Sequence, residues 1–506
     1  MFSKETVKLV GFISLAALFT GLFLSSADFL HTPVTGWKDF CIIVLQWGVV
    51  LAAIGCAIYV LVLNKYVFLL AFPLINAVAA ALAYFRFTAN AVLTTMIVDA
   101  AIHNDAHTSA DLISPALILF VAVIFILSTG FAIYRFKKIV IKKPFIQTLL
   151  AFVIFLLFMQ IPPFKRPVTE RIPFNIYFIT KRYYNEKAVI MTDRPSLSEN
   201  IICPSSEDSL TVVLIIGESL RSDHLGINGY KRNTTPLLQQ EDIISFTNIY
   251  SQYTHTNASL PQLMTRADSL HEDRGYEERS FIDLYKTCGF YSVWLANQES
   301  ANTYVYFMHE CNRLEYVNID KSSYVFDRWL DESMLPLLDN DLDSVQQADK
   351  KLIILHTIGS HWYYNSHYSD AFKKYMPITK SRIISASTLE ELVNSYDNTV
   401  LYTDFFIHEV INRLRDRNAI MIYLSDHGES LGEDNVWLHA VSSPPVHHPA
   451  CMVWMSPAYK KNRPEMYDRA LQNRTRFFKT DFMFHSMLDA AGIGSPFLKP
   501  ELSIFR

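Results

Sequence analysis

The sequence lacks a surplus of either charge and lacks a basic stripe. Its 45 lysine and arginine residues nearly balance 49 aspartate and glutamate residues, for a formal net charge of −4. A nucleic-acid surface needs clustered basic residues with interleaved aromatic residues, and no such run occurs. We therefore expect no nucleic-acid partner. Internal repeats and low-complexity tracts are also missing.

Long apolar runs are missing after about residue 165 and are concentrated before it. A helix needs roughly 20 residues to cross a bilayer. Five runs approach this length, at 9–26, 40–63, 67–85, 113–134 and 145–162. No small-residue cleavage site follows the first run, so we interpret it as a span rather than a signal peptide. Five runs in succession favour a five-helix transmembrane domain over a set of buried core helices.

The short loops between these runs differ in basic residues, which indicates their orientation. Lysine and arginine gather on one side, at Lys4, Lys8, Lys65, Arg135, Lys137, Lys138, Lys142 and Lys143. The opposite short loops carry mainly Lys38 and Arg86. The basic side is therefore expected in the cytoplasm. With five spans, everything after about residue 164 lies outside the cytoplasm.

Cysteine is scarce, with six residues in 506, and no Cys-x-x-Cys metal pattern occurs. Four of the cysteines fall in the exported half, where disulfides are permitted. They are Cys203, Cys288, Cys311 and Cys451. Cys288 with Cys311 is a candidate pair, but the spacing leaves the other pairings open.

The segment 86–112 joins the third and fourth spans on the exported side. Asp99, His103 and His107 recur every fourth residue, so they share one face of a helix near 90–112. One interpretation is a solvated helix face. The other is a helix at the membrane surface whose aligned ionisable groups bind a lipid headgroup. Both interpretations stay open at this point.

A length of 506 residues favours two or three structural units. We expect a transmembrane domain over 1–163, an amphipathic bridge over 164–208 and an exported domain over 209–506. The bridge carries Tyr, Phe and Arg side chains, which suit a membrane interface.

The exported domain opens with TVVLIIG, a short β-branched run of the kind found in buried parallel strands. Similar runs follow at 351–359, 419–428 and 450–457, and helical sequence lies between them, for example around 387–416. Strands that alternate with helices predict an α/β domain with a mainly parallel sheet.

Three of these four strands end in residues that can bind a metal. Glu218 follows the first, His356 and His361 lie at or just after the end of the second, and Asp426 and His427 end the third. Ligands gather at the carboxyl ends of the strands in open α/β sheets, so these residues converge on one site. Two carboxylates and an imidazole suit a divalent metal and leave a position for a nucleophilic oxygen.

A metal lowers the pKa of a hydroxyl that it binds, so a serine or threonine at a turn is needed as the nucleophile. The segment YTHTNASLPQLMTR (253–266) offers Thr254, Thr256 and Ser259. Pro261 predicts a helix start there, and a helix N-terminus stabilises a phosphoryl group.

The motifs taken together resemble one family. They are GESLRSDHLGINGYKRNTTP (217–236), the threonine-rich segment at 254–261, HTIGSH (356–361), SDHGESLGEDNVWLH (425–439) and HHPACMVWMSP (447–457). This ordered set is similar to that of the phosphoethanolamine transferases that modify lipid A or lipopolysaccharide, within the alkaline phosphatase/sulfatase superfamily. The resemblance covers nearly the whole chain, because that family also has five spans followed by an exported α/β domain.

The resemblance implies a role for individual residues. Thr256 matches the family's nucleophile, which also binds zinc, and the other zinc ligands match Glu218, Asp426 and His427. His361 and His439 match histidines around the transferred phosphate and a second zinc. His448 matches a further histidine of the site, and Asp99, His103 and His107 stand where the family has headgroup-binding residues. The cofactor implied is one zinc ion or two, with manganese as the alternative.

Some positions depart from the family pattern. The two cysteines that commonly bracket the nucleophile loop are replaced by Gln252 and Gln262. Trp362 stands where many members have glycine, and Tyr363 and Tyr364 follow it. This aromatic segment would narrow the site or bind a sugar ring, which leaves the acceptor open.

The resemblance implies a monomeric enzyme of the bacterial inner membrane with its catalytic domain in the periplasm. It would move phosphoethanolamine from phosphatidylethanolamine to lipid A, a core sugar or another glycan, through a phospho-threonine intermediate. Phosphoglycerol transfer is the nearest alternative, and a catalytically dead membrane scaffold is another. A sulfatase is disfavoured because no Cys/Ser-x-Pro-x-Arg segment occurs.

Overall fold

The chain divides into two structural units near residue 184. The computed structural model describes residues 4–30, 34, 36–89, 93–95, 98, 114–141, 153, 160–204, 209–319, 328–344, 349–382, 384–439 and 442–506. The first unit ends at Tyr184, and the second takes the chain from Asn185 onward, apart from a short segment that begins at Ile319. The division falls inside helix α9 (Phe174–Ile190), within the predicted bridge.

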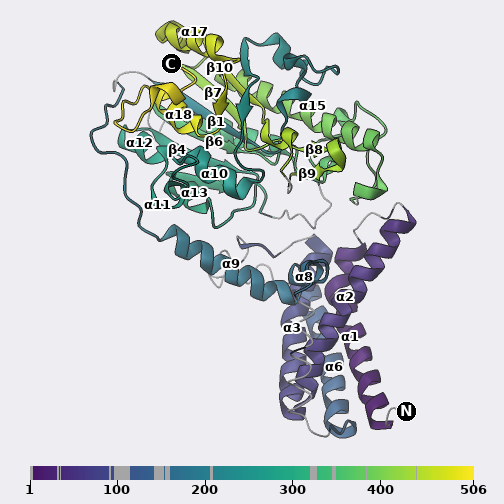
Figure 1. Ribbon diagram of the computed structural model, residues 1–506. Helices are drawn as coiled ribbons and strands as arrows, with labels where there is room; N and C mark the ends of the chain where they lie inside the picture. The colour runs from purple at the N-terminus through teal and green to yellow at the C-terminus, as the bar shows by residue number, and fades with distance from the viewer. Residues whose placement is uncertain are drawn as a thin grey trace. The chain divides into compact units, whose positions relative to one another are not determined.

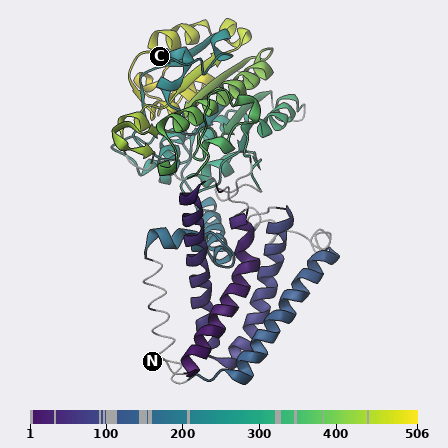
Figure 2. The ribbon, with the colours of Figure 1, turned by 90° about the vertical axis from the view of Figure 1, so that its right-hand side faces the viewer.

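Four long apolar helices dominate the first unit: α1 (Lys4–Leu30), α2 (Trp37–Val62), α3 (Lys65–Ala89) and α6 (Pro115–Lys138). Each contains a stretch that is long and apolar enough to cross a membrane, and the described part of the chain has these four. Figure 2 shows them side by side, with α1 packed against α2 and α3 against α6. Helix α6 begins where the Ser114 hydroxyl accepts a hydrogen bond from the Leu117 amide.

These helices coincide with the first four predicted spans. The fifth, 145–162, lies outside the described residues except at Val153 and residues 160–162, so the count of five stays a prediction. The predicted headgroup ligands Asp99, His103 and His107 also lie outside the described residues. The short helix α8 (Pro162–Thr169) precedes α9.

A seven-stranded sheet forms the centre of the second unit, with the strand order β2-β10-β7-β1-β6-β4-β5. Its strands are β1 (Leu210–Gly217), β2 (Ile243–Phe246), β4 (Tyr291–Ala296), β5 (Arg313–Tyr316), β6 (Lys350–His356), β7 (Ala419–Ser425) and β10 (Cys451–Met455). Two two-stranded ladders accompany it: β3 (Ile249–Tyr250) with β11 (Phe478–Lys479), and β8 (Ser430–Leu431) with β9 (Trp437–Leu438). The four predicted strands are present, and the sheet is mainly parallel as expected.

One predicted strand runs the opposite way. β10 pairs with β7 in the antiparallel sense, whereas β7, β1, β6, β4 and β5 are parallel. A parallel pair needs a crossover connection, usually through a helix. The described residues between β7 and β10 contain only short 3₁₀ turns and the β8–β9 hairpin.

Helices cover both faces of the sheet (Figure 1). Side chains of β1 alternate between two apolar clusters, with Val212, Leu214 and Ile216 on one face and Val213 and Ile215 on the other. The first face is covered by α10 (Thr256–Met264), α12 (Phe281–Thr287), α13 (Val305–Glu310), α16 (Pro457–Asn462), α17 (Pro464–Asn473) and α18 (Phe482–Ala491). The second is covered by α14 (Leu335–Asp343) and α15 (Leu389–Leu414), and the short helix α11 spans Arg274–Glu277.

The disulfide joins Cys203 to Cys288 rather than Cys288 to Cys311. The candidate pairing was therefore wrong. Cys311 directly follows α13 and keeps a free thiol whose pKa is raised by burial. The spacing between cysteines could not reveal that the segment before β1 passes next to the end of α12.

A partly buried carboxyl, that of Glu310, holds the start of α12. The Ser280 hydroxyl accepts from the Ile282 amide as the N-cap, and the Ser280 amide and hydroxyl both donate to the carboxylate of Glu310. Burial favours the neutral carboxyl and outweighs these hydrogen bonds, so the pKa of Glu310 is raised to about 7.

Replacement of Glu310 by glutamine should remove a pH dependence of stability. The folded protein binds a proton at Glu310 that the unfolded chain releases above a pKa of about 4.5, so this group makes stability fall as pH rises towards 7. We expect wild-type protein to lose up to about 3 kcal/mol through this group between pH 4.5 and 7. Thermal melting of wild type and Glu310→Gln at both pH values checks this. An equal slope in the two proteins would contradict it.

Candidate metal and nucleophile site

The carboxyl ends of β1 and β7 bring the predicted metal ligands together. These strands are adjacent and parallel, with Gly217 opposite Ser425. Glu218 follows β1 directly, and Asp426 and His427 follow β7, so their side chains gather at one edge of the sheet. All three are buried, with at most 1% of Glu218 exposed.

The backbone around Glu218 is tightly constrained. A Cβ atom at Gly217 would lie 2.1 Å from the Tyr423 hydroxyl, so only glycine fits before Glu218. Ser219 has a φ of +57°, in the left-handed region that non-glycine residues rarely adopt. The Tyr396 hydroxyl, 2.7 Å from the Ser219 carbonyl oxygen, donates to it and holds this turn. Strain of this kind persists where the surroundings fix a side chain for function.

Thr256 is the first residue of α10 and contacts Glu218. Its hydroxyl donates to Glu218 Oε2 at 2.8 Å. The helix therefore starts five residues before the predicted start at Pro261, which lies inside it. The amides of the first helical turn have no partner within the helix, so they can stabilise a phosphoryl group on Thr256.

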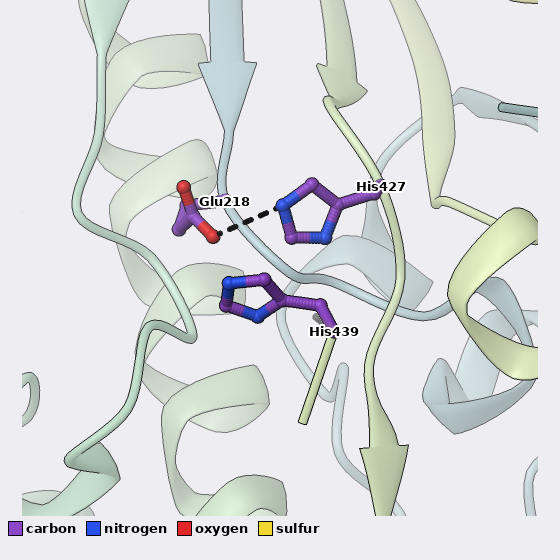
Figure 3. A group of neighbouring side chains, drawn as sticks. All are labelled: Glu218, His427 and His439. Carbon is purple, nitrogen blue, oxygen red and sulfur yellow. Dashed lines mark ion pairs between the residues drawn. The ribbon is translucent and has the colours of Figure 1, made fainter. Parts of the chain in front are cut away.

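Two imidazoles complete the group (Figure 3). His427 Nε2 lies 3.5 Å from Glu218 Oε1 and 3.3 Å from Asp426 Oδ2. The Gly428 carbonyl accepts from His427 Nδ1 at 2.8 Å, which leaves Nε2 as the lone-pair nitrogen. Ligand atoms of Glu218, His427 and His439 all lie within 4.8 Å of one another.

The donor atoms fit a divalent cation. Apart from their contacts with each other and with Glu218, Asp426 Oδ2 and His427 Nε2 are buried without a hydrogen-bond partner among the described residues. A buried polar atom without a partner is rare, and carboxylate oxygen and imidazole nitrogen are common zinc and manganese ligands. The cluster therefore has the chemistry of a metal site, with Thr256 beside it.

The pKa shifts of the buried groups also agree with a metal site. Burial favours a neutral Glu218, but the imidazoles, His427 foremost, lower its pKa to about 2. Burial and the charge of Glu218 raise the pKa of Asp426 well above its usual range. Burial lowers the pKa of His427 to about 3. A divalent cation would favour loss of the proton from Asp426 and would balance both carboxylates.

His439 has the opposite character. Its Nδ1 lies 3.1 Å from Glu429 Oε2, and its ring centroid lies 4.5 Å from that of His427. Burial alone would lower its pKa, but the Glu429 carboxylate raises it to about 9. His439 is therefore protonated at neutral pH and can donate a proton.

The histidines near β6 separate into two environments. The centroid of the His361 ring lies 6.0 Å from that of His439, beside the group formed by Glu218, His427 and His439. His356 is buried against the edges of Trp294 and Tyr304, and burial lowers its pKa to about 4. The structure thus brings His361 to the site and places His356 in an aromatic environment.

His448 is exposed and lies edge-on to Tyr250. Its neighbour His447 stacks on Tyr250 and pairs through Nδ1 with the Ser251 carbonyl at 2.7 Å. No described contact joins His448 to Glu218, so its role in substrate binding stays a prediction.

Three further residues support the site and were not identified from the sequence. Glu429 orients His439, and Gln298 donates to Glu218 Oε2 at 3.1 Å. Asp331 accepts from the amides of Ile358 and Gly359, which fixes the turn before His361. Glu429 lies in the DHGES segment, so its position was a usable signal. Gln298 and Asp331 carry no such signal, because only the fold brings them to the site.

Comparison with known proteins gives one family. The Sulfatase family model matches residues 211–493. Phosphoethanolamine transferase EptA of Salmonella typhimurium is 30% identical over 312 residues, which cover 58% of this chain and 55% of that protein. The chain thus matches about half the length of this curated relative.

Two solved structures are also similar. The integral membrane protein lipooligosaccharide phosphoethanolamine transferase A (EptA) from Neisseria meningitidis is 25% identical, with a TM-score of 0.56 over 98% of each chain. The C-terminal periplasmic domain of EptC from Escherichia coli, in complex with Zn, is 25% identical with a TM-score of 0.56, over 62% of this chain and 90% of that domain.

Replacement of Asp426 by asparagine should separate metal binding from folding. Without metal the carboxyl is neutral, so we expect the variant to melt within about 2 °C of wild type in chelator. Zinc at a hundredfold excess over its Kd should raise the wild-type melting temperature by roughly 5 °C. The variant should gain much less.

The exposed Asp416→Asn variant is the matched control and should respond to zinc as wild type does. An equal zinc response in Asp426→Asn and wild type would show that Asp426 is not a ligand.

Proposed function

The chain belongs to the sulfatase family, and on that premise we propose that it transfers phosphoethanolamine from phosphatidylethanolamine to an envelope acceptor. The acceptor would be a lipid A phosphate, a lipopolysaccharide core sugar or another glycan. The observation that carries this proposal is the Thr256 hydroxyl bonded to buried Glu218 beside Asp426 and His427. The similar proteins are named phosphoethanolamine transferases, which supports phosphoethanolamine as the transferred group.

We propose zinc as the metal, bound by Glu218, Asp426, His427 and the Thr256 oxygen. A second zinc near His361 is compatible with the same cluster, and manganese is the alternative metal. Imidazole together with carboxylates suits zinc, and the Zn complex of EptC from Escherichia coli supports that choice. When bound, zinc lowers the pKa of a coordinated hydroxyl and balances charge on the phosphoryl oxygens.

In the first half-reaction, Thr256 Oγ attacks the phosphorus of phosphatidylethanolamine. The new bond is Oγ–P, and the bond from phosphorus to the diacylglycerol oxygen breaks. The Thr256 hydroxyl donates to Glu218 Oε2, but a carboxylate with a pKa of about 2 does not keep the proton; with zinc bound, the proton would pass to solvent before the attack. Protonated His439 supplies a proton to the departing diacylglycerol oxygen.

In the second half-reaction, the acceptor oxygen attacks the same phosphorus and the Oγ–P bond breaks. His439, now neutral, takes the proton of the acceptor, with His361 as the alternative base. The Thr256 oxygen leaves without a proton, as it was before the first attack. His439 is protonated again, so both groups return to their states before the first half-reaction.

The remaining predicted contacts belong to the substrates and the membrane. We propose that Asp99, His103 and His107 bind the lipid headgroup at the membrane surface, with His448 as a further substrate contact. We also propose a monomer in the bacterial inner membrane with the second unit in the periplasm. Trp362 and Tyr363 are partly exposed, and we propose that they contact a sugar ring of the acceptor, whereas Tyr364 is buried in the core and packs against Trp362 with ring centroids 5.0 Å apart.

Replacement of Thr256 should separate folding from chemistry. Thr256→Ala removes the attacking oxygen, so we expect no transfer above background, with a melting temperature close to that of wild type. Thr256→Ser keeps a hydroxyl and should retain a measurable fraction of the rate. Mass spectrometry of the protein incubated with donor alone should find phosphoethanolamine on the peptide that contains Thr256. Full activity of Thr256→Ala would overturn the assignment.

Headgroup-labelled lipids test the donor. Membranes that contain the protein should move label from phosphatidylethanolamine, and not from phosphatidylglycerol, into envelope lipids or glycans. Mass spectrometry of cells with and without the gene then identifies the modified acceptor. Transfer of label only from phosphatidylglycerol would support a phosphoglycerol transferase instead.

A further inference from the structure

A chain of side-chain hydrogen bonds runs behind the segment that carries Thr256. The Thr480 hydroxyl donates to Gln262 Oε1 at 2.9 Å. Gln262 Nε2 donates to Gln252 Oε1 at 3.4 Å, and Gln252 Nε2 donates to Glu272 Oε1 at 3.1 Å. We call these four residues the glutamine chain. It joins three positions spaced ten residues apart, 252, 262 and 272, to Thr480, which is distant from them in the sequence.

The two glutamines bracket the nucleophile. Gln252 lies four residues before Thr256, and Gln262 lies six residues after it, inside α10. The segment from 252 to 262 is therefore closed on itself by the bond between the two amides. The closed segment includes the start of α10, and Thr256 is the first residue of that helix.

The inner end of the glutamine chain is buried. Thr480 is fully buried and only 2% of Gln262 is exposed. The Gln262 amide uses both its oxygen and its nitrogen in the chain. Because a buried amide that loses a partner is strongly disfavoured, this side chain has one preferred position.

The start of the same segment is hydrogen-bonded to the backbone of Asp426, one of the candidate metal ligands. The Ser251 hydroxyl lies 2.8 Å from the Tyr253 carbonyl oxygen and 2.9 Å from the Asp426 carbonyl oxygen. The segment is thus held at Ser251 against the end of β7 and at Gln262 against Thr480. Thr256 lies between these two attachments.

We propose that Gln252 and Gln262 are positioning residues, which hold Thr256 Oγ against Glu218 through the glutamine chain. The expected loss of catalytic rate rests on the proposed transferase function. The expected displacement of Thr256 does not depend on that function, so the positioning role and the transferase function can be tested separately. A solely structural role would change the melting temperature and leave the rate constant and the Thr256 geometry unchanged.

The test uses the full chain purified in detergent, with phosphatidylethanolamine as donor. Gln252→Met keeps the length of the side chain and removes both of its hydrogen bonds. Thr480→Val keeps the shape and removes the donor to Gln262, whereas Thr480→Ser keeps that donor and is the matched control. Metal content and melting temperature are measured for each variant.

We expect kcat to fall roughly 10- to 100-fold in Gln252→Met and Thr480→Val, because a misplacement of about 1 Å has effects of this size. KM for the donor should stay within about threefold of wild type, since the donor site is unchanged. Thr480→Ser should keep nearly the wild-type kcat. Wild-type kcat in both Gln252→Met and Thr480→Val, or an equal loss in Thr480→Ser and Thr480→Val, would overturn the proposal.

Crystal structures of wild type and Gln252→Met give a readout that is independent of transfer. Displacement of Thr256 Oγ from Glu218 Oε2 in the variant supports the proposal, and the wild-type separation in both overturns it. If wild type transfers no headgroup from any lipid, the proposed function fails, and these structures still decide the role of the glutamine chain.

Discussion

The parallel pairing of β1 with β7 is the constraint on which the site depends. It places Glu218 and Asp426 side by side with almost no access to water. Two buried carboxyl groups cannot both ionise without a compensating charge. The imidazoles of His427 and His439 lie beside these carboxylates, and a bound cation would supply further positive charge. Thr256 is connected to this group of charges, because its hydroxyl donates a hydrogen bond to the Glu218 carboxylate.

The strands that could be predicted are those with a recognisable pattern of apolar residues in their own sequence. β1 and β7, and β6 after its first two lysines, are continuous apolar runs that are fully buried, and each ends at or just before a residue suited to metal binding. β2 and β5 are four residues long and only partly buried, so no pattern marks them. The direction of β10 depends on the connection before it, which a single run of apolar residues does not reveal.

The same distinction applies to the candidate site. Glu218, Asp426 and His427 could be predicted because they follow strands, and the structure brings them together. Gln298 lies two residues after β4 and Asp331 begins a 3₁₀ helix (Asp331–Met334), and neither element was predicted from the sequence. The disulfide was assigned to the wrong cysteine because pairing requires proximity in space rather than in sequence.

The bond between Cys203 and Cys288 encloses a particular part of the chain. The covalent ring spans a sequence separation of 85 residues and contains Glu218 and Thr256, whereas Asp426 and His427 lie far beyond it. A chain that emerges from its N-terminus delivers both cysteines before either of those ligands. Thr256 and Glu218 can thus be enclosed in a covalent ring before β7 has emerged. Asp426 and His427 join them only when β7 pairs with β1.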